Sequence, residues 1–311
     1  MKQILITGGA GFIGSHTADA LLDQGFAVRV LDNLSNGKRA NLDAVALVDG
    51  RLSLIEGDVR DAAMVDAAVN GVDAVLHLAA QVSVPLSVAD PVASSTHNIA
   101  GFLNVLDAVR RLRIPRMVYA SSAAVYGVPE ALPLTEANTA RPLSPYGLEK
   151  FINDQYAALY CELYAVSSVG MRYFNVYGPR QDPKSPYAGV ISKFADGLEG
   201  AKALRLFGDG LQTRDFIYVG DVARANALAL QADVTGVLNV GTGTSVTLLE
   251  LIDAMKEAFG KPAEVRHEPP ATGDIAHSAT NPARLKQTLG WQPATSFVQG
   301  LRALAESLRE T

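Results

Sequence analysis

A tyrosine and a lysine, Tyr146 and Lys150, stand four residues apart in the segment Ser144-Pro-Tyr-Gly-Leu-Glu-Lys150. In a helix this spacing places both side chains on one face. A nearby ammonium favours the ionised form of a phenol, so the pair predicts a tyrosine whose pKa is lowered toward neutral pH. The resulting tyrosinate would be a general base. The alternative is a half-buried tyrosine beside a solvated lysine, and the pair alone does not decide between them.

The residues in front of this pair are typical of a helix start. Ser144 suits an N-cap, and Pro145 suits the first helical position, where its missing N–H costs nothing. We therefore expect a helix over 146–163, and apolar spacing predicts another over 98–112. Both helices carry more apolar residues than one sheet face needs. They are either buried within the monomer or pair with a second copy in a homodimer.

Composition excludes several classes of protein. The chain has 311 residues, 48% of them hydrophobic, and a net charge of −5 without any basic run, which argues against nucleic acid and anionic membranes as partners. Its sole cysteine, Cys161, forms no internal disulfide and no cysteine-based zinc site. No stretch approaches the length of a signal peptide or a membrane span, so we expect a cytoplasmic protein without a metal.

A glycine-rich turn near the amino terminus predicts a dinucleotide site. Gly8, Gly11 and Gly14 lie between an apolar strand at 4–7 and a helix at 15–22. Glycine is needed where the backbone turns tightly and approaches a pyrophosphate, which the helix N-terminus then binds. The next strand ends in Asp32, whose carboxylate suits the ribose 2′-hydroxyl and repels a 2′-phosphate. The pattern therefore favours NAD over NADP.

Short apolar strands alternate with helical stretches along the first two thirds of the chain. This alternation predicts an α/β fold with a doubly wound, Rossmann-like parallel sheet, in which strand ends line the ligand crevice. Asp58, Ala79 and Ala80 follow such strands and are expected to border the cofactor, whereas His77 is interpreted as a core histidine. The predicted strands are 4–7, 28–32, 52–55, 74–78, 116–121, 168–172 and 237–241.

The regular alternation loosens beyond Gly178-Pro179, which suggests a boundary near residue 176. We expect a cofactor-binding domain over 1–175 and a smaller C-terminal substrate-binding domain over 176–311. The strand at 237–241 indicates that the chain returns to the first domain at around 215–242.

Several motifs together resemble the extended short-chain dehydrogenase/reductase family, and in particular its NAD-dependent nucleotide-sugar epimerases. The resemblance extends over essentially the whole chain. The matching segments are Thr7 to Gly14, Asp32-Asn-Leu-Ser, Gly57-Asp-Val, His77-Leu-Ala-Ala, Ser121-Ser-Ala-Ala-Val-Tyr-Gly127, Tyr146 with Lys150, Arg172-Tyr-Phe-Asn175 and Arg214-Asp-Phe-Ile-Tyr.

The resemblance implies roles for individual residues. Ser122, Tyr146 and Lys150 would be catalytic, with Ser122 relaying a sugar hydroxyl proton to the tyrosine. NAD would be held by Gly8, Gly11, Phe12, Ile13, Gly14, Asp32, Asn33, Asp58, Val59, Leu78, Ala79, Ala80, Asn98, Ser121, Tyr146, Lys150 and Phe174. A UDP-sugar would be bound by Ser83, Ser122, Asn175, Phe207, Arg214, Asp274 and Ser278.

Two alanines after Ser122 narrow the reaction. Related 4,6-dehydratases place an acid pair there, and related decarboxylases carry a glutamate at the second position, but this chain has Ala123 and Ala124. Epimerisation at C4 through a 4-keto sugar needs no such extra group. Dehydratase, decarboxylase and reductase activities, and a nonenzymatic NAD-binding sensor on the same fold, stay open as alternatives.

The carboxyl-terminal part departs from the family at the substrate site. Relatives usually have an arginine near position 271 that grips the diphosphate, yet this chain has Ala271. Ser278 falls where a bulky aromatic restricts relatives to unsubstituted hexoses, so a small residue favours UDP-N-acetylglucosamine, with UDP-glucose as a second substrate. Which sugar is preferred stays open at this stage.

Overall fold

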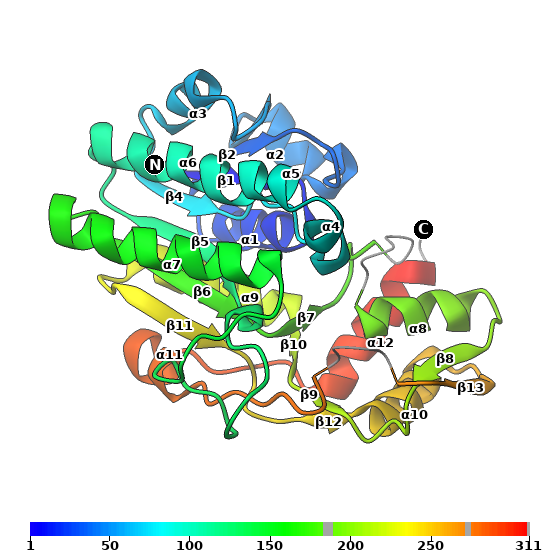
Figure 1. The fold of residues 1–311 in the computed structure, drawn as a ribbon. Coiled ribbons are helices and arrows are strands. Elements are labelled where there is room, and N and C mark those ends of the chain that lie inside the picture. The colour runs from blue at the N-terminus through cyan, green and yellow to red at the C-terminus, as the bar shows by residue number, and fades with distance from the viewer. Residues whose placement is uncertain (183–188, 271–274, 310–311) are drawn as a thin grey trace.

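A seven-stranded parallel sheet organises the molecule (Figure 1). The structure is a computed structural model that describes residues 1–182, 189–270 and 275–309. The strand order is β11-β6-β5-β4-β1-β2-β3. The bounds are β1 Gln3–Thr7, β2 Ala27–Asp32, β3 Leu52–Glu56, β4 Ala74–His77, β5 Met117–Ser122, β6 Ser168–Tyr173 and β11 Gly236–Val240.

Alternating side chains along the central strand β1 enter two different cores. Ile4 and Ile6 belong to one cluster of buried residues and Leu5 to another, because successive residues of a strand point to opposite faces. A sheet buried on both faces needs apolar residues at every position, and this explains the near-continuous apolar runs in the strands.

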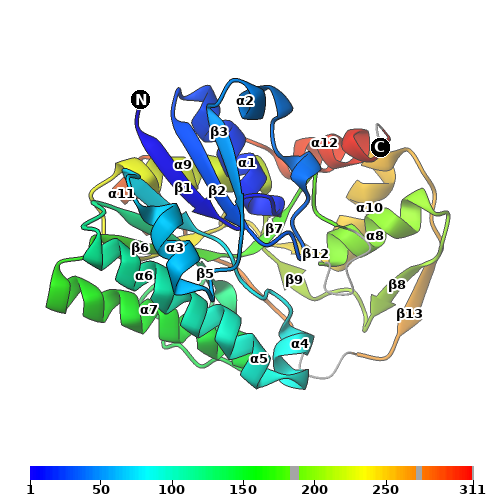
Figure 2. The same cartoon turned by 90° about the horizontal axis from the view of Figure 1, so that it is seen from above.

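Helices cover both faces of the sheet (Figure 2). On one face α1 (Phe12–Asp23) packs against α9 (Val219–Gln231), and on the other α6 (Gly101–Arg111) lies between α3 (Ala62–Val69) and α7 (Pro145–Tyr164). The strand order reverses between β1 and β4, which is the point where a doubly wound sheet binds its ligand. The predicted doubly wound fold is therefore confirmed.

The helix predicted over 98–112 begins differently. The chain forms α5 (Pro91–Ser95), then a π-turn over Thr96–Ala100, and only then α6. A π-turn inserts one extra residue into a helical turn and often marks a functional site. Here it coincides with Asn98, which is buried and bonded to residues outside its own helix.

A separate hydrophobic core lies in the carboxyl-terminal part of the chain. It is built by α8 (Val190–Glu199), α10 (Leu248–Phe259) and α12 (Phe297–Arg309). Three strand pairs accompany it: β7 (Asn175–Tyr177) with β10 (Phe216–Tyr218), β8 (Leu204–Phe207) with β13 (Val265–Glu268), and β9 (Thr213–Arg214) with β12 (Val246–Thr247). The shorter helices are η1 Arg39–Asn41, α2 Ala44–Val48, α4 Val84–Ala89, η3 Ala123–Val125 and α11 Ala283–Leu289.

Within the described ranges, no helix combines the length and the apolar character that crossing a bilayer requires.

Candidate active site

The turn after β1 and the first turn of α1 each have one position with room only for glycine. Gly8 has a φ of +70°, and a Cβ there would lie 2.7 Å from the backbone nitrogen of Ala79. A Cβ on Gly14 would lie 2.3 Å from the carbonyl oxygen of Gly8. Gly11 is the N-cap of α1 and supplies no capping side chain. The first amides of α1, at Phe12 and Ile13, therefore suit an external anion such as a pyrophosphate.

Asp32 lies at the carboxyl end of β2 and contacts the glycine-rich turn. Its Oδ2 accepts a hydrogen bond from the amide of Ala10 at 2.9 Å, and its Oδ1 accepts one from Leu34 at 2.9 Å. The side chain is buried. A carboxylate has about four acceptor positions, so two remain for the hydroxyls of a ribose. The residues at this turn fit a dinucleotide.

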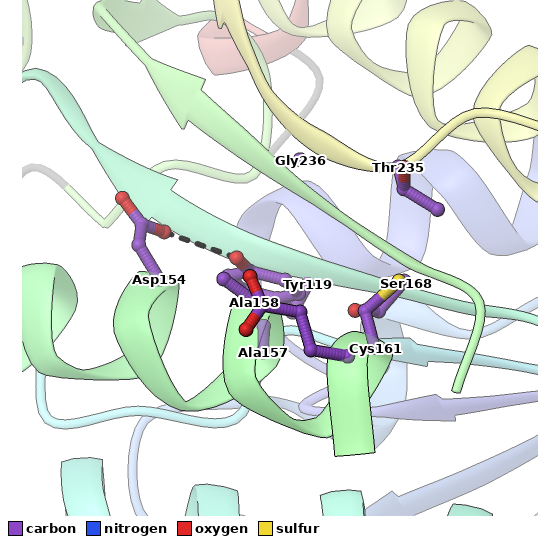
Figure 3. A pocket seen from close by; sticks show the side chains of 9 residues that line it. Tyr119, Asp154, Ala157, Ala158, Cys161, Ser168, Thr235 and Gly236 are labelled. Carbon is purple, nitrogen blue, oxygen red and sulfur yellow. Dashed lines mark hydrogen bonds between the residues drawn. The ribbon is translucent and has the colours of Figure 1, made fainter. Parts of the chain in front are cut away.

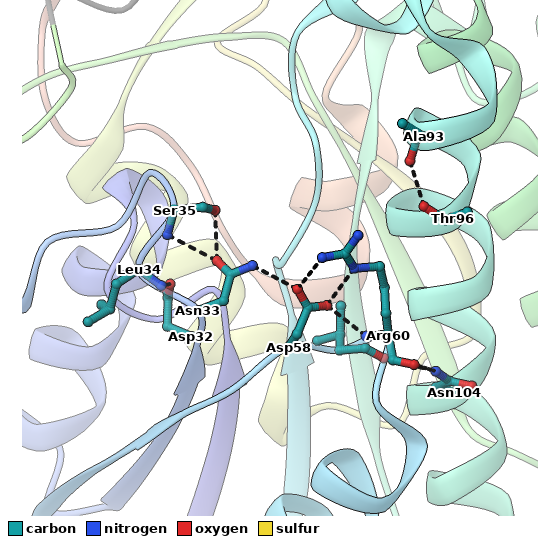
Figure 4. A network of polar contacts seen from close by, with 10 residues as sticks. Asp32, Asn33, Leu34, Ser35, Asp58, Arg60, Ala93, Thr96 and Asn104 are labelled. Atoms are coloured by element: carbon teal, nitrogen blue, oxygen red, sulfur yellow. Dashed lines mark hydrogen bonds and ion pairs between the residues drawn. The ribbon is translucent and has the colours of Figure 1, made fainter.

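Asn33, Asp58 and Arg60 form a polar network beside this turn (Figure 4). The amide nitrogen Nδ2 of Asn33 donates to Asp58 at 2.9 Å, and the guanidinium of Arg60 donates to both oxygens of Asp58, at 2.9 and 2.8 Å. The hydrogen bond from Arg60 is the main reason that the pKa of Asp58 lies well below its usual range. Next to it, the carbonyl oxygen of Val59 accepts from Asn104 at 2.9 Å.

His77 closes the neighbouring strand β4 and is a core histidine, as expected. Its Nδ1 shares a hydrogen bond of 2.8 Å with the hydroxyl of Thr7. Burial lowers the pKa of His77 to about 3, so the ring is neutral at physiological pH. Leu78 and Ala79 follow directly, and their amides donate to the carbonyl oxygen and the hydroxyl of Thr7, at 3.0 and 3.3 Å.

Ser122, Tyr146 and Lys150 come together where β5 ends and α7 begins. Ser144 caps α7 by accepting from the amide of Gly147 at 3.1 Å, which confirms the predicted helix start. The Nζ of Lys150 lies 5.8 Å from the centre of the Tyr146 ring. Ser122 is the last residue of β5, and its hydroxyl accepts from the amide of Ala124 at 3.1 Å.

The pKa of Tyr146 differs from the sequence-based expectation. Burial raises it, a hydrogen bond with Ser122 partly offsets this rise, and the charge of Glu149 adds to it. Burial also lowers the pKa of Lys150 to about 8, against the opposing effects of Asp154 and Glu149. The ammonium of Lys150 donates to the carbonyl oxygen of Ala120 at 3.0 Å. The protein alone therefore keeps the phenol protonated at neutral pH, because desolvation disfavours its anion.

Sequence reasoning missed a buried ion pair behind this trio. Asp154 accepts from Arg172 at 3.0 Å, from Ser121 at 3.1 Å and from Tyr119 at 3.2 Å. Asp154 lies one helical turn after Lys150, and this i,i+4 spacing could have placed its carboxylate near the lysine, but not its pairing with Arg172. The hydroxyl of Ser121 is directed into this network, and Arg172 extends it to the hydroxyl of Tyr126 at 2.9 Å.

The segment after β4 folds against the start of α7. Gln81 exchanges two hydrogen bonds of 2.8 Å with the side chain of Asn98. Ser83 is buried and caps α4 by accepting from the amide of Leu86 at 3.0 Å. The hydroxyl of Ser87 accepts from the amide of Tyr146 at 3.1 Å. This segment therefore contacts the helix that carries the tyrosine and the lysine.

The remaining predicted substrate residues lie on the chain beyond β6. Asn175 opens β7, and its side chain donates to the carbonyl oxygen of Asp215 at 3.1 Å. Arg214 donates to the carbonyl oxygens of Thr213 and Ala276, at 2.9 and 3.3 Å. Ser278 joins the same group, because its amide donates to Thr213 at 3.1 Å. These contacts place Asn175 and Ser278 next to residues 213–215, the segment that carries Arg214.

Two other predicted residues lie apart from this group. Phe207 ends β8 with 39% of its surface exposed and lies under the guanidinium of Arg205, 5.4 Å from the ring centre. Phe174 is buried with Val125, Tyr126 and Leu134 in a small cluster. Asp274 and Ala271 lie outside the described residues.

Asp215 is a second residue that sequence reasoning missed. It is fully buried, and its carboxylate accepts from the amides of Thr242 and Gly243, both at 2.9 Å. Burial raises its pKa, and these hydrogen bonds oppose the rise. The carboxylate connects the chain between β9 and β10 to the turn after β11. It thereby fixes the backbone next to Arg214.

A cavity of about 190 Å³ opens at the amino ends of the strands β6 and β11 (Figure 3). Cys161, Ser168 and Gly236 line it, and the last two begin β6 and β11. Ser122 lies at the carboxyl end of its strand. The cavity and the group of Ser122, Tyr146 and Lys150 therefore lie at opposite ends of the parallel strands.

Among the described residues, no group of histidine, cysteine and carboxylate side chains is arranged to hold a metal ion.

Comparison with known proteins supplies further findings. Residues 4–241 match the model of the NAD dependent epimerase/dehydratase family. A UDP-glucose 4-epimerase from Mycolicibacterium smegmatis is 37% identical over 315 residues, which cover 99% of this chain and 98% of that protein.

Two solved structures are also similar over nearly the whole chain. A UDP-N-acetylglucosamine 4-epimerase from Methanobrevibacter ruminantium M1, in complex with UDP-N-acetylmuramic acid, has a TM-score of 0.95, 37% identity, and coverage of 99% of this chain and 98% of that one. A UDP-glucose 4-epimerase from Thermus thermophilus, in complex with NAD, has a TM-score of 0.90, 40% identity, and coverage of 99% of both chains.

Proposed function

This chain belongs to the NAD dependent epimerase/dehydratase family, and from that premise we propose that it catalyses NAD-dependent 4-epimerisation of a UDP-sugar through a 4-keto intermediate. The observation that carries the proposal is that Ser122, Tyr146 and Lys150 lie together at the carboxyl end of β5, the same end of the parallel sheet at which the glycine-rich turn follows β1. The similar proteins named above, two UDP-glucose 4-epimerases and one UDP-N-acetylglucosamine 4-epimerase, support the same reaction.

The residues that would hold NAD are those of the β1–α1 turn and Asp32. The turn offers unpaired helix amides to the pyrophosphate, and Asp32 has acceptor positions left for the ribose. The other residues assigned to NAD in the sequence analysis are part of the same proposal. Bound NAD⁺ supplies reversible hydride transfer at the sugar carbon, and it brings a positive charge.

The protein's own part in the reaction is to move a proton. In its ionised form, Tyr146 accepts the proton of the sugar C4 hydroxyl, directly or through Ser122, and later returns it to the C4 oxygen of the opposite epimer. The ammonium of Lys150, 5.8 Å from the tyrosine ring, stabilises the phenolate during the reaction. Because burial raises the pKa of Tyr146, the tyrosine is a strong base once ionised. Ala123 and Ala124 supply no further acid or base, which favours epimerisation over elimination.

The substrate assignments form part of the same proposal. Arg214 offers a planar, permanently charged fork to the diphosphate, and Asn175 is bonded to the carbonyl oxygen of Asp215, the next residue in the chain. Phe207 would contact the uracil, and Ser83, Asp274 and Ser278 complete the proposed set. Because Ser278 is small, we propose that the site accepts UDP-N-acetylglucosamine as well as UDP-glucose.

We also propose that the enzyme is a cytoplasmic homodimer. Leu159, Leu163 and Tyr164 leave 44%, 61% and 50% of their surfaces exposed along α7, and Leu112 leaves 36% exposed after α6. These apolar side chains stay partly exposed in the monomer, which favours pairing with a second copy over the alternative of burial within the monomer. Pairing with a second copy would cover them. Light scattering of the purified protein measures the mass directly, and a monomer at micromolar concentration would contradict the dimer.

One assay separates the possible reactions. The purified protein is mixed, without added cofactor, with UDP-glucose, with UDP-N-acetylglucosamine or with a thymidine-linked glucose, and the products are separated by chromatography. Formation of the C4 epimer without net change in NAD redox state is the expected result. A 4-keto-6-deoxy sugar would indicate a dehydratase. Two further mixtures test the other enzymes: loss of carbon dioxide from an added UDP-uronic acid would indicate a decarboxylase, and stoichiometric oxidation of added NADH would indicate a reductase. No turnover would favour a sensor.

A further inference from the structure

Glu149, between Tyr146 and Lys150 in sequence, is a buried carboxylate. It is only 3% exposed. Its Oε2 accepts a hydrogen bond from the hydroxyl of Ser94 at 2.9 Å and another from Asn98 at 2.6 Å. Its Oε1 is buried without a hydrogen-bond donor, and among the described residues Glu149 forms no ion pair. Burying a carboxylate with so few partners is costly, and such a cost is often tolerated at functional sites.

The two partners of Glu149 belong to the neighbouring helical segment. Ser94 lies in α5, and Asn98 lies in the π-turn that follows it. Asn98 also holds Gln81, and its carbonyl oxygen accepts from Asn153 of α7 at 3.0 Å. Glu149 thereby connects α7 to the segment over 81–98, which carries residues assigned to the cofactor and to the sugar.

The charge of Glu149 acts on both members of the tyrosine–lysine pair. It adds to the rise in the pKa of Tyr146, because a second negative charge disfavours the phenolate. It opposes the fall in the pKa of Lys150, because it stabilises the ammonium. Removing the charge therefore moves both pKa values in the same direction, toward lower pH.

Other charged or titratable groups surround the pair from the packed elements. Asp154 lies on α7 itself and favours the ammonium of Lys150. His77 on β4 is neutral, Tyr119 on β5 has a raised pKa, and Arg172 on β6 is paired with Asp154. Glu149 differs from all of these because its carboxylate is neither paired with a cation nor fully hydrogen-bonded.

We propose that Glu149 is a positioning residue for the reaction: it holds Ser94 and Asn98 against the helix that carries Tyr146 and Lys150, and its charge biases the protonation of that pair. This inference rests on the proposed epimerase function. It assigns to Glu149 two separable effects, a tether that depends on side-chain length and an electrostatic effect that depends on charge.

Two variants separate these effects. Glu149→Gln keeps the length and removes the charge, while Glu149→Asp keeps the charge and shortens the reach. The matched control is Glu162→Gln, which removes the same charge from an exposed position near the other end of α7. Each holoenzyme is assayed for epimerisation from acid to alkaline pH, and hydrogen–deuterium exchange is measured on peptides spanning 91–100.

For Glu149→Gln we expect both limbs of the bell-shaped pH profile to shift toward lower pH, by roughly 0.5 to 1 pH unit. An ultraviolet difference titration against Tyr146→Phe should show the same shift in the ionisation of Tyr146. Glu149→Asp should keep both limbs in place but increase exchange over 91–100, and Glu162→Gln should change neither. A pH profile of Glu149→Gln that superimposes on that of the wild type, or unchanged exchange in Glu149→Asp, would overturn the inference.

The two proposals fail in distinguishable ways. If the unaltered protein epimerises no UDP-sugar, the proposed function fails, and the exchange and ultraviolet measurements still report on the tether and on the charge. If the unaltered protein is active and the Glu149 variants behave like Glu162→Gln, only the role of Glu149 fails.

Discussion

The Nζ of Lys150 donates a hydrogen bond of 3.0 Å to the carbonyl oxygen of Ala120, two residues before Ser122 on β5. This contact joins the first turns of α7 to the carboxyl end of β5. It orients the ammonium without a carboxylate partner, so its charge is available to a phenolate 5.8 Å away at the ring of Tyr146. The geometry of the trio therefore depends on how α7 docks on the sheet.

Replacing Tyr146 with phenylalanine should lower turnover by at least ~100-fold, because the variant loses the proposed general base. Folding and NAD binding should be preserved, since only one hydroxyl is removed. Chromatographic separation of the two epimers measures the rate, and enzymatic assay of released NAD measures the cofactor. The control is Tyr164→Phe, which removes a hydroxyl from an exposed position on the same helix. Near-normal turnover of Tyr146→Phe would reject the assignment.

Acid should destabilise the protein partly through His77. Its pKa is about 3 in the folded protein and 6.5 in the unfolded chain, so the unfolded chain binds more protons between these two pH values. The contribution of His77 to the free energy of unfolding is therefore fully present above pH 6.5 and is lost progressively as the pH falls toward 3. Urea denaturation at pH 7 and pH 5 should show a smaller pH-dependent loss in His77→Gln than in the wild type. Equal losses would contradict this account.

Breaking the buried pair of Asp154 and Arg172 should cost about 3 to 5 kcal/mol, since Arg172→Met leaves an uncompensated buried carboxylate. The double variant Asp154→Leu with Arg172→Met should cost less than the sum of the single changes, as chemical denaturation of all four proteins would show. The exposed pair of Arg266 and Glu264 serves as the control, and its loss should change stability by less than about 1 kcal/mol.

Enlarging Ser278 should separate the two candidate sugars. Its amide and carbonyl bind Thr213 and Ser245, which fixes the backbone, so Ser278→Tyr mainly adds bulk. We expect turnover of UDP-N-acetylglucosamine to fall by about 10-fold or more relative to that of UDP-glucose, since the N-acetyl group needs the space. Ser278→Ala should leave the ratio of the two rates unchanged. An unchanged ratio in Ser278→Tyr would remove Ser278 from the specificity argument.

Local signals in the sequence were sufficient for the sheet and for the start of α7. The strand that ends at Ser122, the cap at Ser144 and the glycine-rich turn each depend on neighbouring residues, and each was found where it was predicted. The residue assignments at the cofactor and substrate sites stay predictions. Asp274 in particular lies outside the described residues.

Features that depend on distant contacts were not predictable. Arg172 and Asp154 are 18 residues apart, and only the docking of α7 on β6 shows that they pair. The contacts of Glu149 with Ser94 and Asn98 span 55 and 51 residues. The sign of the shift in the pKa of Tyr146 also follows from burial, which the four-residue spacing to Lys150 does not contain.

The position of β11 has a consequence for biosynthesis. This strand pairs with β6 through residues 236–240, so the sheet edge beside β6 stays open until that part of the chain has left the ribosome. A nascent chain that ends shortly after β6 exposes the unpaired backbone of a parallel strand, a surface prone to association. The time needed to synthesise the intervening segment therefore sets how long this edge of the sheet stays exposed on the growing polypeptide.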